Sequence, residues 1–187
     1  PGSVDQTQQN LLFFPAGTGD ADTRGIVHLT PGSYKLEYVT WEGGGGFFYE
    51  VSVAHGFFPA NADTSTWTPV GISSNRTTPI QYPSMVGQWA VDSTMAGVQV
   101  GSNEAASASV DAAIAADPVA TRSLWDSINF QDDGGGGSSE RIGGSDIFPR
   151  IAVGAVDDNF ALRAQGTLHI PEEGDYLIGF QGDDGSK

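Results

Sequence analysis

Two stretches of the chain alternate large apolar residues with other residues, and this alternation predicts β-strands. Every second residue from Tyr34 to Tyr38 is large and apolar, and the same period of two returns from Phe47 to Val53. Since successive side chains of a strand point to opposite faces, each stretch predicts a strand with one buried face. The glycines Gly43–Gly46 lie between them. We therefore predict a β-hairpin with a glycine-rich connection.

Short apolar runs bounded by turn residues predict further strands, and one segment predicts a helix. The other strand candidates are residues 26–29, 160–163, 167–170 and 176–180. Residues 57–103 hold short apolar pieces among Pro, Ser, Thr and Asn, which indicates loops and edge strands. Glu104–Ala116 is rich in alanine, a strong helix former, and Asp117-Pro118 ends it. The pattern predicts an all-β chain with one short helix, which we expect to bridge two β units.

A pattern of strand, tight turn and second strand occurs twice in the chain. Gly25–Tyr34 matches Gly166–Tyr176 with one inserted residue, and each copy contains a histidine, His28 or His169. We expect two similar β-corners from this match. Neither histidine has a nucleophile motif beside it, so a surface or cross-strand position is the better interpretation for both.

The charge balance excludes several classes of partner. The chain has 187 residues, of which 23 are acidic and 8 basic, and its formal net charge is −15. Nucleic acids and anionic membranes recruit clustered basic residues, so neither is an expected partner. No run approaches the roughly 18 apolar residues of a spanning helix, so we expect no direct membrane insertion. An aspartate-rich chain with lysine only at Lys35 and Lys187 favours an extracellular protein.

The sequence offers few groups for catalysis. Cysteine is absent, which excludes disulfides, zinc-finger sites and thiol chemistry. The motifs Gly-x-Ser-x-Gly and His-Glu-x-x-His are also absent, and carboxylate pairs arise by chance in a chain with 23 acids. No predicted helix follows Gly43–Gly46, as a phosphate-binding loop would require. We therefore predict that the protein is not an enzyme.

Motifs near both ends of the chain resemble one family. The run Asp157–Arg163, the segment Gly166–Tyr176 and the closing Asp183–Ser186 resemble the first half of a protective-antigen-type β-sandwich domain. Ile26–Val53, with its Leu-Thr-Pro-Gly-Ser-Tyr turn and glycine-rich connection, resembles the second half of that domain. The resemblance covers roughly half of the chain. It implies an antiparallel, jelly-roll-like β-sandwich.

The two half-motifs stand in swapped order relative to the family. By this resemblance residues 1–56 form a second-half hairpin region, residues 57–106 a loop-rich connection with edge strands, and residues 107–187 a first-half region. The chain is then one circularly permuted domain, or two half-domains of a tandem array completed by neighbouring copies. Lys187 falls inside a motif that continues in the family, so we expect a β edge there that strand addition covers.

The resemblance also implies a metal site. In the adhesin branch of the family, paired aspartates like Asp183 and Asp184 hold a calcium ion that contacts sugar hydroxyls. Adjacent carboxylates on a tight loop suit this ion, which takes about six to eight oxygen ligands. Other members keep the same turn without a sugar site. Asp20 and Asp22 are secondary candidates, for which solvated loop acids are the alternative.

Aromatic residues complete the predicted ligand site. Trp41, Trp67 and Trp89 are candidates for stacking on sugar rings, and core positions are the alternative for each. The sequence thus predicts a secreted or cell-surface module for adhesion or carbohydrate binding, with calcium as its candidate cofactor and glycans as partners. The alternative is a structural repeat subunit of a cell-surface fibre or layer. Neighbouring copies of the same chain would then complete it by strand exchange.

Overall fold

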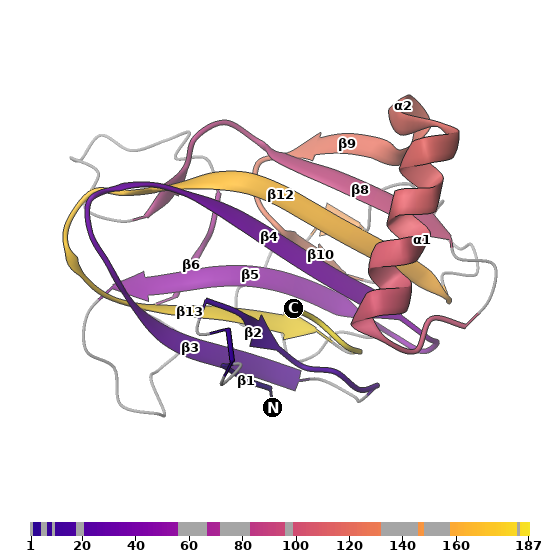
Figure 1. Cartoon of the computed structure of the whole chain (residues 1–187), viewed down its shortest axis with the longest axis horizontal. Coiled ribbons are helices and arrows are strands. Elements are labelled where there is room, and N and C mark those ends of the chain that lie inside the picture. The colour runs from indigo at the N-terminus through magenta and orange to yellow at the C-terminus, as the bar shows by residue number, and fades with distance from the viewer. Residues whose placement is uncertain are drawn as a thin grey trace.

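In the computed structural model, two antiparallel β-sheets pack face to face, which confirms the predicted all-β sandwich (Figure 1). The structure describes residues 2–4, 7–8, 10–17, 21–55, 67–71, 83–95, 99–131, 146–147, 158–182 and 184–187. The strands are β1 (Ser3–Val4), β2 (Leu12–Phe13), β3 (Ala21–Leu29), β4 (Gly32–Glu42), β5 (Phe48–His55), β6 (Thr68–Pro69), β7 (Ser84–Met85), β8 (Trp89–Met95), β9 (Arg122–Trp125), β10 (Asn129–Gln131), β11 (Asp146–Ile147), β12 (Phe160–Ile170) and β13 (Gly174–Gly182). The helices are α1 (Asn103–Ala116) and α2 (Pro118–Thr121).

Each of the two packed sheets mixes strands from distant parts of the sequence. One sheet, here called the helix-side sheet, has the order β4–β12–β8–β9, with β7 beside β12. The other, here called the opposite sheet, has the order β11–β10–β5–β13–β3, with β6 beside β5. Neighbouring strands run antiparallel except β10 and β11, which are parallel. Strands from residues 1–56 therefore pair with strands from residues 107–187 in both sheets, within one chain.

The two matching sequence segments build two corners at which the chain crosses between the sheets. β3 of the opposite sheet turns into β4 of the helix-side sheet, and β12 turns into β13 in the reverse direction. The corners pair with each other, β4 with β12 and β3 with β13, and they lie together at the left of Figure 1. The expected pair of similar β-corners is confirmed.

The predicted hairpin across Gly43–Gly46 is wrong, because β4 and β5 lie in different sheets. β4 pairs with β12, whereas β5 pairs with β13, β10 and β6. Tyr38 of β4 and Tyr49 of β5 are both buried in the core between the sheets. An alternating pattern identifies the buried face of a strand but not its partner, since a hairpin and an arch bury the same residues. The glycine run forms an arch from one sheet to the other.

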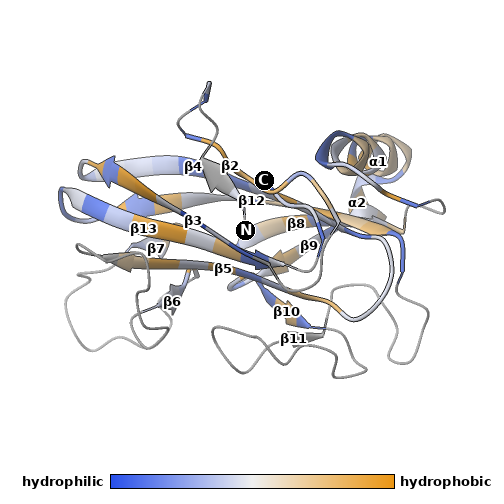
Figure 2. Ribbon diagram, turned by 90° about the horizontal axis from the view of Figure 1, so that it is seen from below, coloured by the Kyte–Doolittle hydropathy of each residue, from blue (hydrophilic) through white to orange (hydrophobic). Residues whose placement is uncertain are grey.

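Helix α1 covers the outer face of the helix-side sheet (Figure 2). The Ser102 hydroxyl caps its start by accepting a hydrogen bond from the Ala105 N–H at 3.2 Å, and Asp117 follows its last residue. Ala106 and Val110 are fully buried in a small cluster between helix and sheet. The helix is therefore a cover for one sheet and does not bridge two β units. Neither described helix is long and apolar enough to cross a membrane.

Candidate functional site

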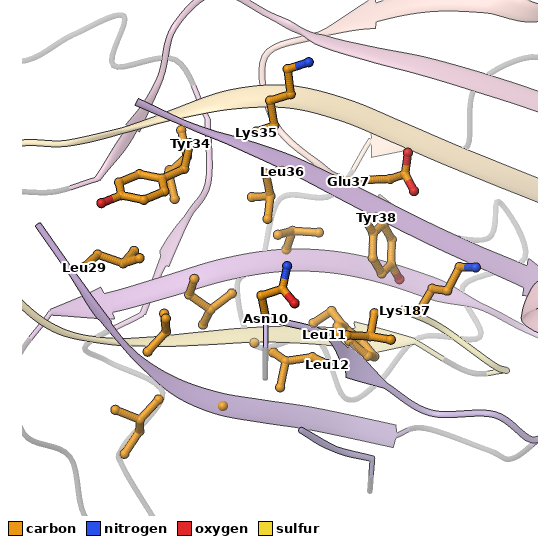
Figure 3. A pocket seen from close by; sticks show the side chains of 18 residues that line it. Asn10, Leu11, Leu12, Leu29, Tyr34, Lys35, Leu36, Glu37, Tyr38 and Lys187 are labelled. Carbon is orange, nitrogen blue, oxygen red and sulfur yellow. The ribbon is translucent and has the colours of Figure 1, made fainter. Parts of the chain in front are cut away.

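An apolar groove opens where the free edges of the two sheets separate, between β3 and β4 (Figure 3). Its volume is about 270 Å³. Val27 and Leu29 of β3, Tyr34 and Leu36 of β4, and Ile178 of β13 line it. These five side chains pack against the main core but are only half-buried. The groove therefore marks a side of the sandwich on which the core is incompletely covered.

Two segments from opposite ends of the sequence close one end of the groove. Phe14 and Ser186 exchange backbone hydrogen bonds of 2.7 and 2.8 Å, and Leu12 lines the adjoining wall. Lys187 exchanges bonds of 2.8 and 2.9 Å with Val39 of β4. Lys187 is therefore paired, and it is not itself the open edge that the sequence predicted.

The open edge belongs to β4. Residues 185–187 form a short row beside this strand, here called the edge row: the Gly185 carbonyl accepts a hydrogen bond from the Trp41 N–H, and Lys187 exchanges two with Val39. Because hydrogen-bonding directions alternate along a strand, Glu37, Lys35 and Ser33 direct their N–H and C=O groups into the continuation of the same row. In the described part of the chain, no backbone group bonds to these three residues from that side. Such an edge accepts an additional strand.

Side chains along this edge alternate between the groove and the outer surface. Tyr34 and Leu36 pack against the main core, whereas Lys35 and Glu37, which also border the groove, have exposed side chains on the other face of β4. Figure 3 shows the Lys35 side chain directed away from the groove. The Glu37 carboxylate accepts a hydrogen bond from the Gln165 side-chain amide on β12 at 2.6 Å. The edge thus offers apolar contacts inside and two opposite charges outside.

Asp184, a predicted calcium ligand, caps the glycine arch. Asp184 is nearly buried, with 9% of its surface exposed. Its Oδ2 accepts a hydrogen bond from the Gly43 N–H at 2.7 Å. Glu42 and Asp158 accept hydrogen bonds from the N–H groups of the two following glycines, at 2.6 and 3.2 Å. Consecutive backbone N–H groups form an anion-binding concavity. Here three carboxylates of the chain itself accept the hydrogen bonds of these N–H groups.

The tyrosine beside this arch is structural. The Tyr49 hydroxyl lies 3.1 Å from the Trp41 carbonyl oxygen and 3.3 Å from Glu42 Oε2, and it donates toward both. Burial, followed by the negative charge of Glu42, raises the pKa of Tyr49 well above its ordinary value. The phenol therefore remains protonated as a hydrogen-bond donor at neutral pH.

Of the other predicted calcium ligands, Asp22 alone lies within the described residues. Asp22 lies on β3 and forms an ion pair with Arg24. Asp20 and Asp183 lie outside the described residues. Within the described ranges, no group of three or more His, Asp or Glu side chains is arranged to hold a metal ion. Calcium binding by Asp183 and Asp184 stays a prediction.

The three tryptophans expected to stack on sugars all lie in the interior. Trp89 belongs to the main core, Trp41 packs beneath α1, and Trp67 packs in a small cluster with Ala54 and Leu177. Their exposed fractions are 0%, 4% and 6% in that order. These positions are the core placement that the sequence left as the alternative. The burial leaves no broad ring face open to a ligand.

His28 occupies the surface cross-strand position that the sequence indicated. It lies opposite Asp175 in the pairing of β3 with β13. Its Nδ1 is 2.9 Å from Asp175 Oδ1, and its Nε2 is 3.3 Å from Glu173 Oε1. The hydrogen bond to Asp175, and next the one to Glu173, raise the pKa of His28 above 6.5. The cluster is exposed and serves as a link between two strands.

The groove residues were not predicted as functional from the sequence. The predicted site residues were aspartates and tryptophans, whereas the groove is formed by ordinary core residues at the edges of two sheets. The one available signal was the alternation of apolar and charged residues from Tyr34 to Tyr38, which is typical of a strand with one solvent-facing side.

No family model, no curated protein and no solved structure matches this chain. The resemblance to the protective-antigen-type domain accordingly stays a prediction. The function is therefore argued from the groove and from the strand edge beside it.

Proposed function

We propose that the chain is a non-catalytic assembly module whose groove binds an extended segment of a neighbouring polypeptide as an added β-strand. One observation carries the proposal: the half-covered core side chains of the groove lie directly beside the open edge of β4. This corresponds to the structural subunit, completed by its neighbours, that the sequence left as an alternative. Glycan binding has less support, because the three tryptophans predicted for it are buried.

An extended peptide suits this groove better than a compact small ligand. A strand would satisfy the backbone groups of Lys35 and Glu37 and would also cover Leu36 and its neighbours. Full burial of a large apolar side chain stabilises by about 1.5–3 kcal/mol, and these half-buried residues would gain part of that amount. A volume of about 270 Å³ falls just below the range of roughly 300–1,000 Å³ for drug-sized ligands.

A proline substitution at the edge tests the proposal. Glu37→Pro removes a backbone N–H that points to the open side of β4. It leaves the bonds between β4 and β12 in place, because alternate residues make those bonds. Proline is tolerated on edge strands for this reason. We expect the variant to keep its fold and to lose its binding of a seven-residue peptide that alternates valine and threonine. Isothermal titration calorimetry measures this binding.

Glu37→Thr is the matched control, since it removes the same carboxylate and keeps the N–H. We expect it to bind the peptide as the natural chain does. Binding by the proline variant at full strength would contradict strand addition at β4. Absence of binding by the natural chain at millimolar peptide would contradict the proposed function itself.

A further inference from the structure

We infer that His28 is a pH-sensitive latch between the two corners of the sandwich, closed when its imidazole is charged and open when it is neutral. His28 is the last residue but one of β3, directly before the β3–β4 corner. Its side chain contacts two acids at the corner between β12 and β13. The inference concerns how firmly β3 is held, so it does not depend on what the groove binds.

Both ring nitrogens of His28 face a carboxylate. Nδ1 lies 2.9 Å from Asp175 Oδ1, and Nε2 lies 3.3 Å from Glu173 Oε1. An ionised carboxylate only accepts hydrogen bonds, and a neutral imidazole carries one N–H where the charged ring carries two. Only the charged imidazole can therefore donate to both acids at once. Loss of its proton leaves a nitrogen lone pair facing one of the two carboxylates.

The charged groups that act on His28 come from the neighbouring strand and its turn. Asp175 lies opposite His28 on β13, and Glu173 lies in the turn between β12 and β13. The other charged residues of β3, Asp22 and Arg24, form an ion pair with each other. The hydrogen bonds to Asp175 and Glu173 raise the pKa of His28 above 6.5. The change between the closed and the open latch therefore falls above pH 6.5.

The latch lies where the pairing of β3 ends. Among the described strands of its sheet, β3 is an edge strand that pairs with β13 alone. Leu29 stands opposite Gly174 at the end of this pairing, and His28 adds a side-chain link beside it. The ends of elements open locally at a small cost in free energy. Release of Glu173 should therefore loosen the end of β3 and the start of β13 together.

The other matching histidine provides an internal control. His169 on β12 takes the equivalent position in the sequence match, and it stands opposite Ser33 on β4. In that match Ser33 occupies the position of Asp175. A serine hydroxyl can donate as well as accept, so this pair does not require a charged ring. We therefore expect the pH dependence in the pairing of β3 with β13 and not in that of β4 with β12.

Amide hydrogen exchange of the full chain at about pH 5.5 and about pH 9 tests the latch. Rates are expressed as protection factors, which removes the pH dependence that exchange shows in an unfolded chain. We expect the protected amides of residues 26–29 and 174–177 to lose protection by about two- to five-fold at the higher pH, because surface ion pairs are weak. The protected amides of residues 32–35 and 167–170 should not change.

Two variants separate the latch from a general effect of charge. In Glu173→Gln, the glutamine amide can donate to Nε2 of the neutral ring while Nδ1–H donates to Asp175. We expect this variant to keep its protection at both pH values. Glu172→Gln removes an exposed acid from the same turn that does not act on His28, and it should lose protection as the natural chain does.

Three results would overturn the latch. The first is equal protection of residues 26–29 in the natural chain at both pH values. The second is a loss of the same size in Glu173→Gln, and the third is a loss that Glu172→Gln abolishes or that extends equally to the pairing of β4 with β12.

Discussion

The carboxylate of Asp184 links the C-terminal motif to the glycine arch more than a hundred residues earlier. It accepts the Gly43 N–H from a nearly buried position, whereas Asp158 contacts the same arch from its exposed side. A hydrogen bond to a buried charged group contributes about 1.5–3 kcal/mol. We expect Asp184→Ala to lower the free energy of unfolding by about 2 kcal/mol in urea titrations. Asp158→Ala should cost less than about 1 kcal/mol, and equal losses would contradict the assigned role.

The calcium prediction is tested at the same residue. A calcium ion held by Asp183 and Asp184 would stabilise the folded chain by mass action. We then expect calcium to raise the melting temperature of the natural chain, and chelator to remove that increase. Asp184→Asn should melt at the same temperature in both conditions. Identical melting of the natural chain with calcium and with chelator would show that this loop does not bind the ion.

His28 predicts a pH dependence with a definite sign. Its pKa is raised above 6.5 by hydrogen bonds to Asp175 and Glu173. The contribution of these bonds to stability is therefore complete below pH 6.5 and is lost as the pH rises through the folded pKa. In an NMR titration we expect the His28 pKa to lie above 6.5, and Asp175→Asn to bring it back toward that value. A pKa unaffected by Asp175→Asn would contradict the assignment.

At the scale of elements, the helix is attached to its sheet through few side chains. Val110 is fully buried against the helix-side sheet, while Val119 of α2 is 83% exposed. Val110→Ala removes about two buried methyl groups and leaves a cavity, so we expect a loss of about 2 kcal/mol in the free energy of unfolding. Val119→Ala, the same substitution at the surface, should change it by less than about 0.5 kcal/mol. Similar losses in the two variants would argue against helix docking through Val110.

Strand and helix positions could be predicted from the sequence because they depend on local periodicity. The period of two marked β4 and β5, and alanine content with Asp117-Pro118 marked α1. The partners of the strands could not be predicted in the same way. Gly43–Gly46 fits a hairpin and an arch equally well, and only long-range pairing with β12 and β13 decides between them.

The candidate site depends even more on long-range pairing. Phe14 meets Ser186 and Lys187 meets Val39 at one end of the groove, and among the described residues no strand lies beside the rest of the β4 edge. None of these contacts has a local signature. The tryptophans were predicted as ligand-binding from their residue type, but residue type alone does not separate a buried indole from an exposed one.

At the scale of the whole molecule, the sandwich has two paired corners at one end and a partly closed side between β3 and β4. The corners of β3–β4 and β12–β13 hold both sheets together at one end, and the segments around Phe14 and Ser186 close the free side in part. The remaining opening exposes half-buried core side chains next to β4. An incomplete cover of this kind is what a neighbouring strand would complete.

Amide hydrogen exchange at the β4 edge tests this account most directly. The measurement follows the N–H groups of Lys35 and Glu37 in the free chain and with the seven-residue peptide that alternates valine and threonine, and Val39, already bonded to Lys187, is the internal control. We predict fast exchange at Lys35 and Glu37 in the free chain, strong protection with peptide, and no change at Val39. Exchange at Lys35 and Glu37 that stays fast at saturating peptide would contradict the account.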